Sequence, residues 1–196
     1  ADYNASINNI VVAQKAGTEM RNVNRFFVKT PKKLRDVAQA FCDYYLPRSN
    51  RDVIYYYDST AVASSALSDT TFAEEIISVL SDRGFYVTPV YLGQPEKHDV
   101  KHIQIDNALK GDPRFLFPVF NSDRCADLVL SMQLTGVSIG RNGFEKNKAS
   151  EKRPDSPEEP DELKPHGTDA WDTLFIGMNF HRPIISHQSY ASRLLS

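Results

Sequence analysis

The segment Asp52–Tyr57 constrains the fold of this chain more than any other. It reads DVIYYY, a short continuous run of strand-forming residues that stops at Asp58, and such a run is typical of a strand buried on both faces of a sheet. An amphipathic helix pattern follows over 71–83 and a further strand pattern over 85–91. Strand, helix and strand at these lengths predict a right-handed parallel unit. We therefore expect an α/β fold with a carboxylate at the end of a central strand.

The rest of the chain alternates between the same two patterns. Apolar and β-branched runs separated by Gly17 predict an antiparallel hairpin or meander at the start of the chain. The expected strands are 7–14, 23–29 and 115–120, and the expected helices are 31–46, 98–110 and 122–136. Thr30 followed by Pro31 predicts the start of the first helix, and Thr168 predicts the N-cap of a last one.

Composition narrows the class of protein. A chain of 196 residues with 41% apolar residues is expected to form a single domain over 1–196. No apolar run approaches the roughly 20 residues that a bilayer requires. Cys42 and Cys125 are the only cysteines, which argues against a disulfide framework or a thiolate zinc site and favours a reducing cytoplasm. With a net charge of -2, binding to nucleic acid would have to depend on a local basic patch or on metal ions.

Residues 140–165 differ in composition from the rest. Basic residues come first, and four prolines with five acidic residues follow from Pro154 onward. This segment is predicted to be a mobile surface hairpin or loop. Its basic side chains either grip phosphates or form an ordinary solvated face; they are Arg141, Lys146, Lys148 and Lys152.

Several common catalytic motifs are missing from the sequence. It contains no G-x-x-x-x-G-K-[ST], no G-x-G-x-x-G after a strand and no G-x-S-x-G, so a nucleotide-binding enzyme or a serine hydrolase is not supported. His98 and His102 are spaced by four residues, but a zinc site would need a third ligand. We interpret this pair as part of a solvated helix face.

Carboxylates at the ends of predicted elements are more informative. Asp2 opens the first strand, Asp58 ends the Ile/Tyr strand, and Asp169 and Asp172 lie one turn apart on the last helix. Hard divalent cations prefer such oxygen ligands, and two of them about 4 Å apart could support hydrolysis of a phosphodiester. Each acid also has a plain alternative, as a loop cap, a helix-dipole partner or a terminal residue.

The element order is that of the ribonuclease H topology, in which the first and fourth strands are adjacent. On this basis and on four segments, the chain resembles the nuclease domain of the large subunit of tailed-bacteriophage terminases. The segments are DYNA at 2–5, YYYDST at 55–60, GFEKNK at 143–148 with SEK at 150–152, and HGTDAWD at 166–172. The resemblance implies a central mixed sheet of five or more strands flanked by helices, with a basic hairpin inserted before the last helix.

The same resemblance implies a metal-dependent endonuclease that cuts concatemeric viral DNA during genome packaging. Asp2, Asp58 and Asp169 would be the catalytic acids and, with Asp172, the ligands of two Mg²⁺ or Mn²⁺ ions. A metal-activated water would attack the phosphate and leave 5′-phosphate and 3′-hydroxyl ends. His166 would orient a ligand or a water.

The implied partners follow from the role in packaging. Double-stranded DNA would be held by Arg141, Lys146, Lys148 and Lys152. The ATPase motor domain, expected to be absent from this chain, the small terminase subunit and the portal would be the protein partners, in the cytoplasm of an infected bacterium. The alternatives are a resolvase or exonuclease of the same superfamily, and a catalytically idle DNA-binding or interaction domain.

Overall fold

The structure is a computed structural model that describes residues 1–3, 6–48, 50–62, 69–140 and 143–181, and the side chain of Asp2 also lies outside this description. No helix in these ranges is long and apolar enough to cross a membrane. The strands are β1 (Asp2–Tyr3), β2 (Ile7–Ala16), β3 (Glu19–Lys29), β4 (Asp52–Tyr57), β5 (Tyr86–Tyr91), β6 (Phe117–Phe120), β7 (Val137–Gly140) and β8 (Gly143–Lys146). The α-helices are α1 (Leu34–Tyr45), α2 (Phe72–Asp82), α3 (His98–Leu109), α4 (Ala126–Leu134) and α5 (His166–Phe180), and short 3-10 turns are η1 (Ser59–Val62), η2 (Ala149–Lys152) and η3 (Asp161–Leu163).

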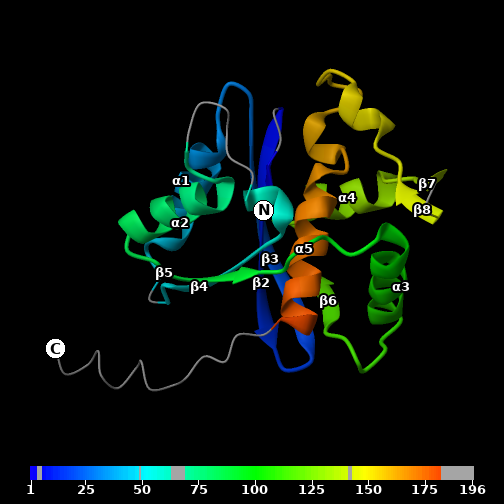
Figure 1. Cartoon of the computed structure of the whole chain (residues 1–196), viewed down its shortest axis with the longest axis horizontal. Coiled ribbons are helices and arrows are strands. Elements are labelled where there is room, and N and C mark those ends of the chain that lie inside the picture. Colours follow the sequence, from blue (N-terminus) through cyan, green and yellow to red (C-terminus); the bar gives the residue numbers. More distant parts are fainter. Residues whose placement is uncertain (4–5, 49, 63–68, 141–142, 182–196) are drawn as a thin grey trace.

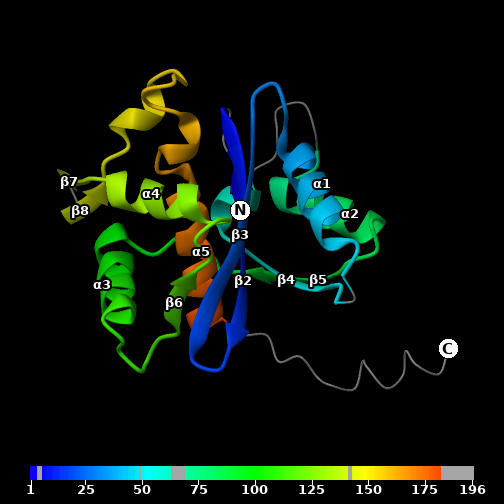
Figure 2. The same cartoon turned by 180° about the vertical axis from the view of Figure 1, so that it is seen from behind.

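The largest sheet contains four strands in the order β1-β2-β3-β6. The predicted meander is present, since β1 pairs antiparallel with β2 and β2 pairs antiparallel with β3. The short strand β6 joins β3 in parallel. Helices α1 and α2 lie on one side of the long β2–β3 pair, and α3, α4 and α5 lie on the other (Figures 1 and 2). The molecule is therefore an α/β fold, as its sequence predicted.

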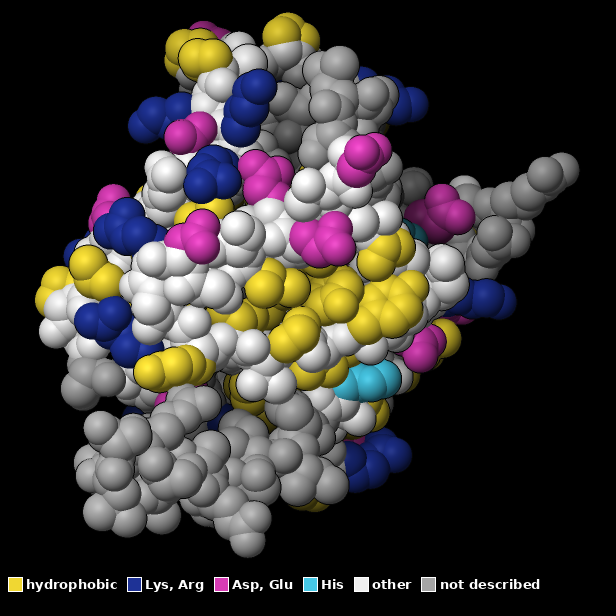
Figure 3. Space-filling view, turned by 60° about the vertical axis from the view of Figure 1, so that its left-hand side comes forward, with side chains coloured by type: hydrophobic (Ala, Val, Ile, Leu, Met, Phe, Trp, Pro, Cys, Tyr) yellow, Lys and Arg dark blue, Asp and Glu magenta, His cyan; other side chains and the backbone are white. Residues whose placement is uncertain are grey.

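The predicted strand–helix–strand unit is confirmed as a parallel pair. Strands β4 and β5 run in parallel and are paired from Asp52 to Tyr57, and α2 connects them. The helix starts at a capping box in which the Thr71 hydroxyl accepts from the Glu74 N–H and the Glu74 carboxylate accepts from the Thr71 N–H. Figure 3, which brings this side of the molecule forward, shows a band of hydrophobic side chains across it.

Strand β4 is the boundary between two hydrophobic cores. Tyr55 belongs to the core formed with α1 and α2, and its neighbour Tyr56 belongs to the core formed with α5. Successive side chains of a strand point to opposite faces, so Tyr55 and Tyr56 are buried on opposite faces of β4, whereas Asp52 at its start is exposed. The predicted burial on both faces holds for this part of the strand. Gly177 brings α5 close to this strand, because a Cβ at that position would overlap the ring of Tyr56.

The described residues do not form the single sheet of five or more strands that the terminase resemblance implies. Strand β4 pairs with β5 alone, in a separate sheet of two strands. Residues 10–15 of β2 and 52–56 of β4 instead line a cavity of about 830 Å³. Contact between the first and fourth strands is made by side chains, through a hydrogen bond between the hydroxyls of Tyr3 and Tyr55.

Two predicted helix starts are wrong. Helix α1 is capped at Lys33, whose N–H donates to Asp36 at 2.6 Å, whereas the N–H of Thr30 donates to Ser6 O and remains tied to the sheet. Helix α5 begins at His166, earlier than the predicted cap at Thr168. The Thr168 hydroxyl donates to Pro165 O at 2.7 Å and accepts from the Lys146 ammonium at 2.9 Å. The contacts with Ser6 and Lys146 are made by residues distant in the sequence, and the local sequence does not reveal them.

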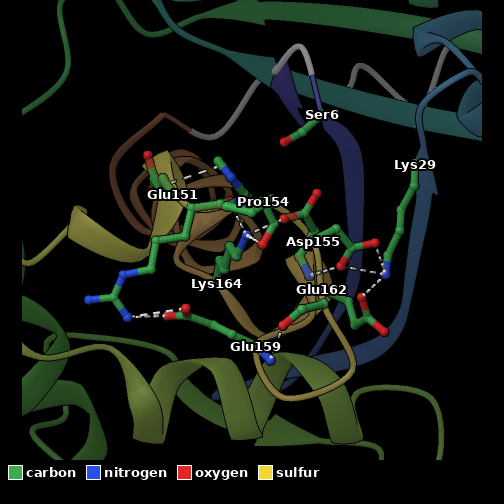
Figure 4. A network of polar contacts seen from close by, with 12 residues as sticks. Ser6, Lys29, Glu151, Pro154, Asp155, Glu159, Glu162 and Lys164 are labelled. Carbon is green, nitrogen blue, oxygen red and sulfur yellow. Dashed lines mark hydrogen bonds and ion pairs between the residues drawn. The ribbon is translucent and has the colours of Figure 1, made fainter.

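The acidic, proline-rich part of 140–165 is joined to the body of the protein by a polar network (Figure 4). Lys164 is 2% exposed, and its ammonium donates to Arg153 O at 2.7 Å and to the Asp161 carboxylate. Lys29 on β3 forms ion pairs with Asp155 and Glu162. Much of the negative charge in this segment is therefore balanced within the protein. The predicted mobility of 140–165 as a whole stays a prediction.

Candidate active site

Asp58 stands directly after β4 and uses its two carboxylate oxygens differently. Oδ1 accepts from the N–H and the hydroxyl of Thr60, at 3.0 and 2.6 Å, so the acid caps the turn that follows the strand. Oδ2 accepts from the hydroxyl of Thr173 on α5 at 3.1 Å. The end of the strand is thereby connected to the helix that carries the other predicted acids.

Asp169 and Asp172 face the basic hairpin and α3. The ammonium of Lys146 lies 3.0 Å from Asp169 Oδ1 and 2.7 Å from Asp172 Oδ2. Lys148 pairs with Asp169 Oδ2, and Lys101 on α3 lies 3.4 Å from Asp172 Oδ2. We call this group the α5 ion-pair cluster; it consists of Lys101, Lys146, Lys148, Asp169 and Asp172.

The charges of the cluster reinforce one another. Burial by itself raises the pKa of Asp169, but the ammoniums of Lys146 and Lys148 outweigh burial and hold this pKa below its usual value. Burial likewise lowers the pKa of Lys146, but Asp172 and Asp169 outweigh it and raise the pKa. Burial, followed by the charge of Lys101, lowers the pKa of the neighbouring His98. At neutral pH, Asp169 is therefore anionic, Lys146 cationic and His98 uncharged.

Asp58 and Asp172 meet at one small cavity of about 40 Å³. The cavity is also lined by Thr173, which donates to Asp58, and by Lys101, which pairs with Asp172. Glu96 and His181 complete its polar lining. The space is sufficient for a few water molecules. Two predicted ligands that are far apart in the sequence are thus brought to the same cavity. Helix α5, which carries Asp172, packs against β4, which Asp58 follows.

Two carboxylates of this cavity could serve as ligands of a divalent cation. Mg²⁺ is commonly bound by one or two carboxylates with waters and substrate phosphate completing its shell, and Asp58 and Asp172 supply two carboxylates. Among the described residues, no three His, Cys, Asp or Glu side chains lie close enough together to hold an ion by themselves. Asp2 is on β1, which packs against α5, but its side chain lies outside the described residues and its role stays a prediction.

No protein-family model, curated protein or solved structure matches this chain. An assignment of function therefore depends on the residues of the site.

The other predicted site residues are distributed differently. Lys146 and Lys148, predicted to hold phosphates, contact carboxylates of the site. Lys152 is exposed on η2, and Arg141 lies outside the described residues. His166 is buried as the first residue of α5, with Nδ1 3.8 Å from Glu151 Oε1. The structure thus joins Asp58, Asp169, Asp172, Lys146 and Lys148.

Sequence reasoning missed two residues of the site. Thr173 lies four residues after Asp169 and therefore on the same face of the helix, and this spacing could have identified it. Lys101 is only 9% exposed, which is unusual for a lysine. It lies between His98 and His102 on α3. His102 is exposed, as expected for a solvated helix face, whereas His98 is half-buried and its Nδ1 is buried.

Proposed function

We propose that this chain is a metal-dependent nuclease domain that hydrolyses phosphodiester bonds of DNA. One observation carries the proposal. Asp58, at the end of β4, and Asp172, on α5, line the same cavity, and the hydroxyl of Thr173 on α5 donates a hydrogen bond to Asp58. Carboxylates that converge from separate elements are what hard divalent cations require. The lysines beside them would attract a polyanion.

In the proposed reaction, two Mg²⁺ or Mn²⁺ ions would be held by Asp58, Asp169, Asp172 and Asp2. The ions would supply a nucleophilic water and stabilise the charge that develops on the phosphate. Thr173 keeps Asp58 in place. Lys146 and Lys148, with Lys152 and Arg141 farther along the hairpin, bind backbone phosphates. Because these contacts are ionic, binding would weaken as the salt concentration rises. Because phosphates carry no sequence information, binding would also be mostly independent of DNA sequence.

A further part of the proposal concerns the biological setting in which the nuclease acts. We infer a ribonuclease H-like nuclease of a tailed-phage terminase that cuts concatemeric double-stranded DNA in the cytoplasm of the infected bacterium. Its partners would be the motor domain, the small terminase subunit and the portal. The support is the resemblance of the four sequence segments, two of which contain Asp58, Asp169 and Asp172.

A catalytically idle interaction domain is the second candidate, and specific contacts favour it. Asp58 already caps a turn through Thr60, and Asp169 already forms ion pairs with two lysines. These contacts would suffice to explain both acids as structural residues.

A cleavage assay separates the two candidates. Duplex DNA and a four-way junction are incubated with the protein in Mg²⁺, in Mn²⁺ and in EDTA, and the variants Asp58→Asn, Asp169→Asn and Asp2→Asn are compared with wild type. We expect metal-dependent cleavage of duplex DNA that each substitution abolishes. Asp106→Asn is the matched control, because Asp106 is an acid on α3 that pairs with exposed Lys110.

The outcomes distinguish the proposals. Preference for the junction would indicate a resolvase. Cleavage that persists in Asp58→Asn and Asp169→Asn would contradict the assigned site, and absence of cleavage by wild type in either metal would favour the interaction domain.

A further inference from the structure

The basic hairpin, residues 137–152 without the undescribed 141–142, distributes its side chains in an unusual way. Its apolar residues face solvent: Ile139 is 85% exposed and Phe144 57% exposed. By contrast, the charged side chain of Lys146 lies against α5 and is only 18% exposed. The hairpin packs against α3, but none of its described residues belongs to either hydrophobic core. Ion pairs rather than apolar burial therefore hold this element against α5.

These ion pairs use the same oxygen atoms that a divalent cation needs. Both oxygens of Asp169 are engaged, Oδ1 by Lys146 and Oδ2 by Lys148. Lys146 also lies on Asp172 Oδ2, which is 3.4 Å from the ammonium of Lys101. A cation that coordinates Asp169 would therefore compete with an ammonium for a carboxylate oxygen and would repel that ammonium. Conversely, an ammonium on Asp169 is not available to a phosphate.

We propose that Lys146 and Lys148 compete with divalent cations for Asp169 and Asp172, so that the binding of metal and the binding of DNA phosphate promote each other. This inference rests on the proposed nuclease function and adds its regulation. In the closed form, the lysines cover the acids. A phosphate backbone that draws the lysines away exposes carboxylates to the cation, and a cation that takes the carboxylates releases lysines to the DNA. Such a coupling must be equal in both directions.

The first test measures metal binding without DNA. Calorimetric titration with Mn²⁺ compares wild type with Lys146→Gln/Lys148→Gln and with Lys148→Gln alone. We expect the variants to bind Mn²⁺ about tenfold more tightly, the order of a typical coupling. Lys110→Gln, which removes an exposed lysine that pairs with Asp106 away from the site, should match wild type. Because Lys146 is buried, its loss could unfold the protein; the single variant at Lys148, whose side chain is 42% exposed, keeps the test valid.

The second test follows the hairpin itself. Lys146 and Lys148 are trypsin sites that the ion pairs protect, so Mn²⁺ should accelerate cleavage after these residues, as identified by mass spectrometry. In parallel, the affinity for a fluorescent DNA duplex is measured in Ca²⁺ and in EDTA. Wild type should bind DNA about tenfold more tightly in Ca²⁺, and the double variant should lose this difference.

The results separate this inference from the proposed function. If wild type cuts DNA with Mg²⁺ but all variants bind Mn²⁺ with wild-type affinity or more weakly, competition by the lysines is wrong and the nuclease proposal stands. If neither wild type nor variants bind Mn²⁺, both the competition by the lysines and the nuclease proposal are wrong. Unchanged trypsin cleavage on addition of Mn²⁺ to a protein that binds it would also overturn the competition.

Discussion

The hydroxyl of Thr173 donates a hydrogen bond to Asp58 Oδ2 at 3.1 Å and lies 3.2 Å from the carbonyl oxygen of Asp169. A single side chain thus connects the end of β4 to the turn of α5 that carries the other acids. Residues that orient ligands in this way commonly affect metal binding or activity by tenfold to a hundredfold.

Replacement of Thr173 by valine tests this connection. Thr173→Val preserves the shape but removes the hydroxyl, so the affinity for Mn²⁺ and kcat should fall by about tenfold or more. The free energy of unfolding should fall by only about 1 kcal/mol. Thr135→Val is the matched control, because Thr135 donates to Ser131 O at 2.6 Å outside the site. Equal losses of metal affinity in both variants would contradict a positioning role for Thr173.

Gly177 sets the spacing between α5 and β4. In Gly177→Ala the new Cβ would overlap the ring carbons of Tyr56 and lie 2.9 Å from its Cβ. Overpacking of this kind typically costs about 1–3 kcal/mol, and the shift should also reduce metal affinity by separating Asp58 from Asp172. Gly136→Ala is the control, since its Cβ would meet only Asn147 Cβ at 3.8 Å. Urea unfolding and calorimetric titration measure the two effects, and wild-type stability of Gly177→Ala would refute the close approach.

Lys164 stabilises the acidic segment through a buried ion pair. In Lys164→Met, the carboxylate of Asp161, only 4% exposed, would lose its ammonium partner. Leaving a buried charge unpaired typically costs about 3–5 kcal/mol, which urea unfolding can measure. Lys110→Met removes an exposed pair with Asp106 and should cost at most about 0.5 kcal/mol. Similar losses in the two variants would contradict the role of burial.

The pH dependence of stability should show the ionisation of Asp169. The pKa of this carboxyl is held below its ordinary 3.8 by Lys146 and Lys148, against the effect of burial. The unfolded chain therefore binds its proton first as pH falls, so the stabilisation is complete above pH 3.8 and disappears as pH falls through the lower folded value. The difference in unfolding free energy between wild type and Asp169→Asn should therefore shrink only below pH 3.8. A difference that shrinks already near neutral pH would contradict the ionised pair.

Much of the secondary structure could be predicted because the signals are local. The strand 52–57, the helix that Thr71 caps and the parallel pairing of 52–57 with 85–91 all follow from periodicity and spacing. The predicted helix starts at Thr30 and Thr168 are wrong because each threonine is engaged by a residue distant in the sequence, Thr30 by Ser6 and Thr168 by Lys146.

Only part of the candidate site could be predicted from the sequence. Asp58, Asp169 and Asp172 were found because a carboxylate at the end of an element is visible in the sequence. Lys101 and Thr173 were missed, since their importance comes from contacts with residues 71 and 115 positions away.

By itself, the sequence determined the order of helices and strands, the acids at their ends and the basic character of 140–152, because each depends on residue type and short spacing. Only the tertiary structure decided that β4 and β5 form a sheet separate from β2 with a cavity between β4 and β2, that Asp58 and Asp172 share one cavity, and that Lys146 and Lys148 rest on carboxylates. The physical reason is that charge and hydrogen-bond partners are selected by distance in space, which packing of α5 against β4 creates and which no local pattern encodes.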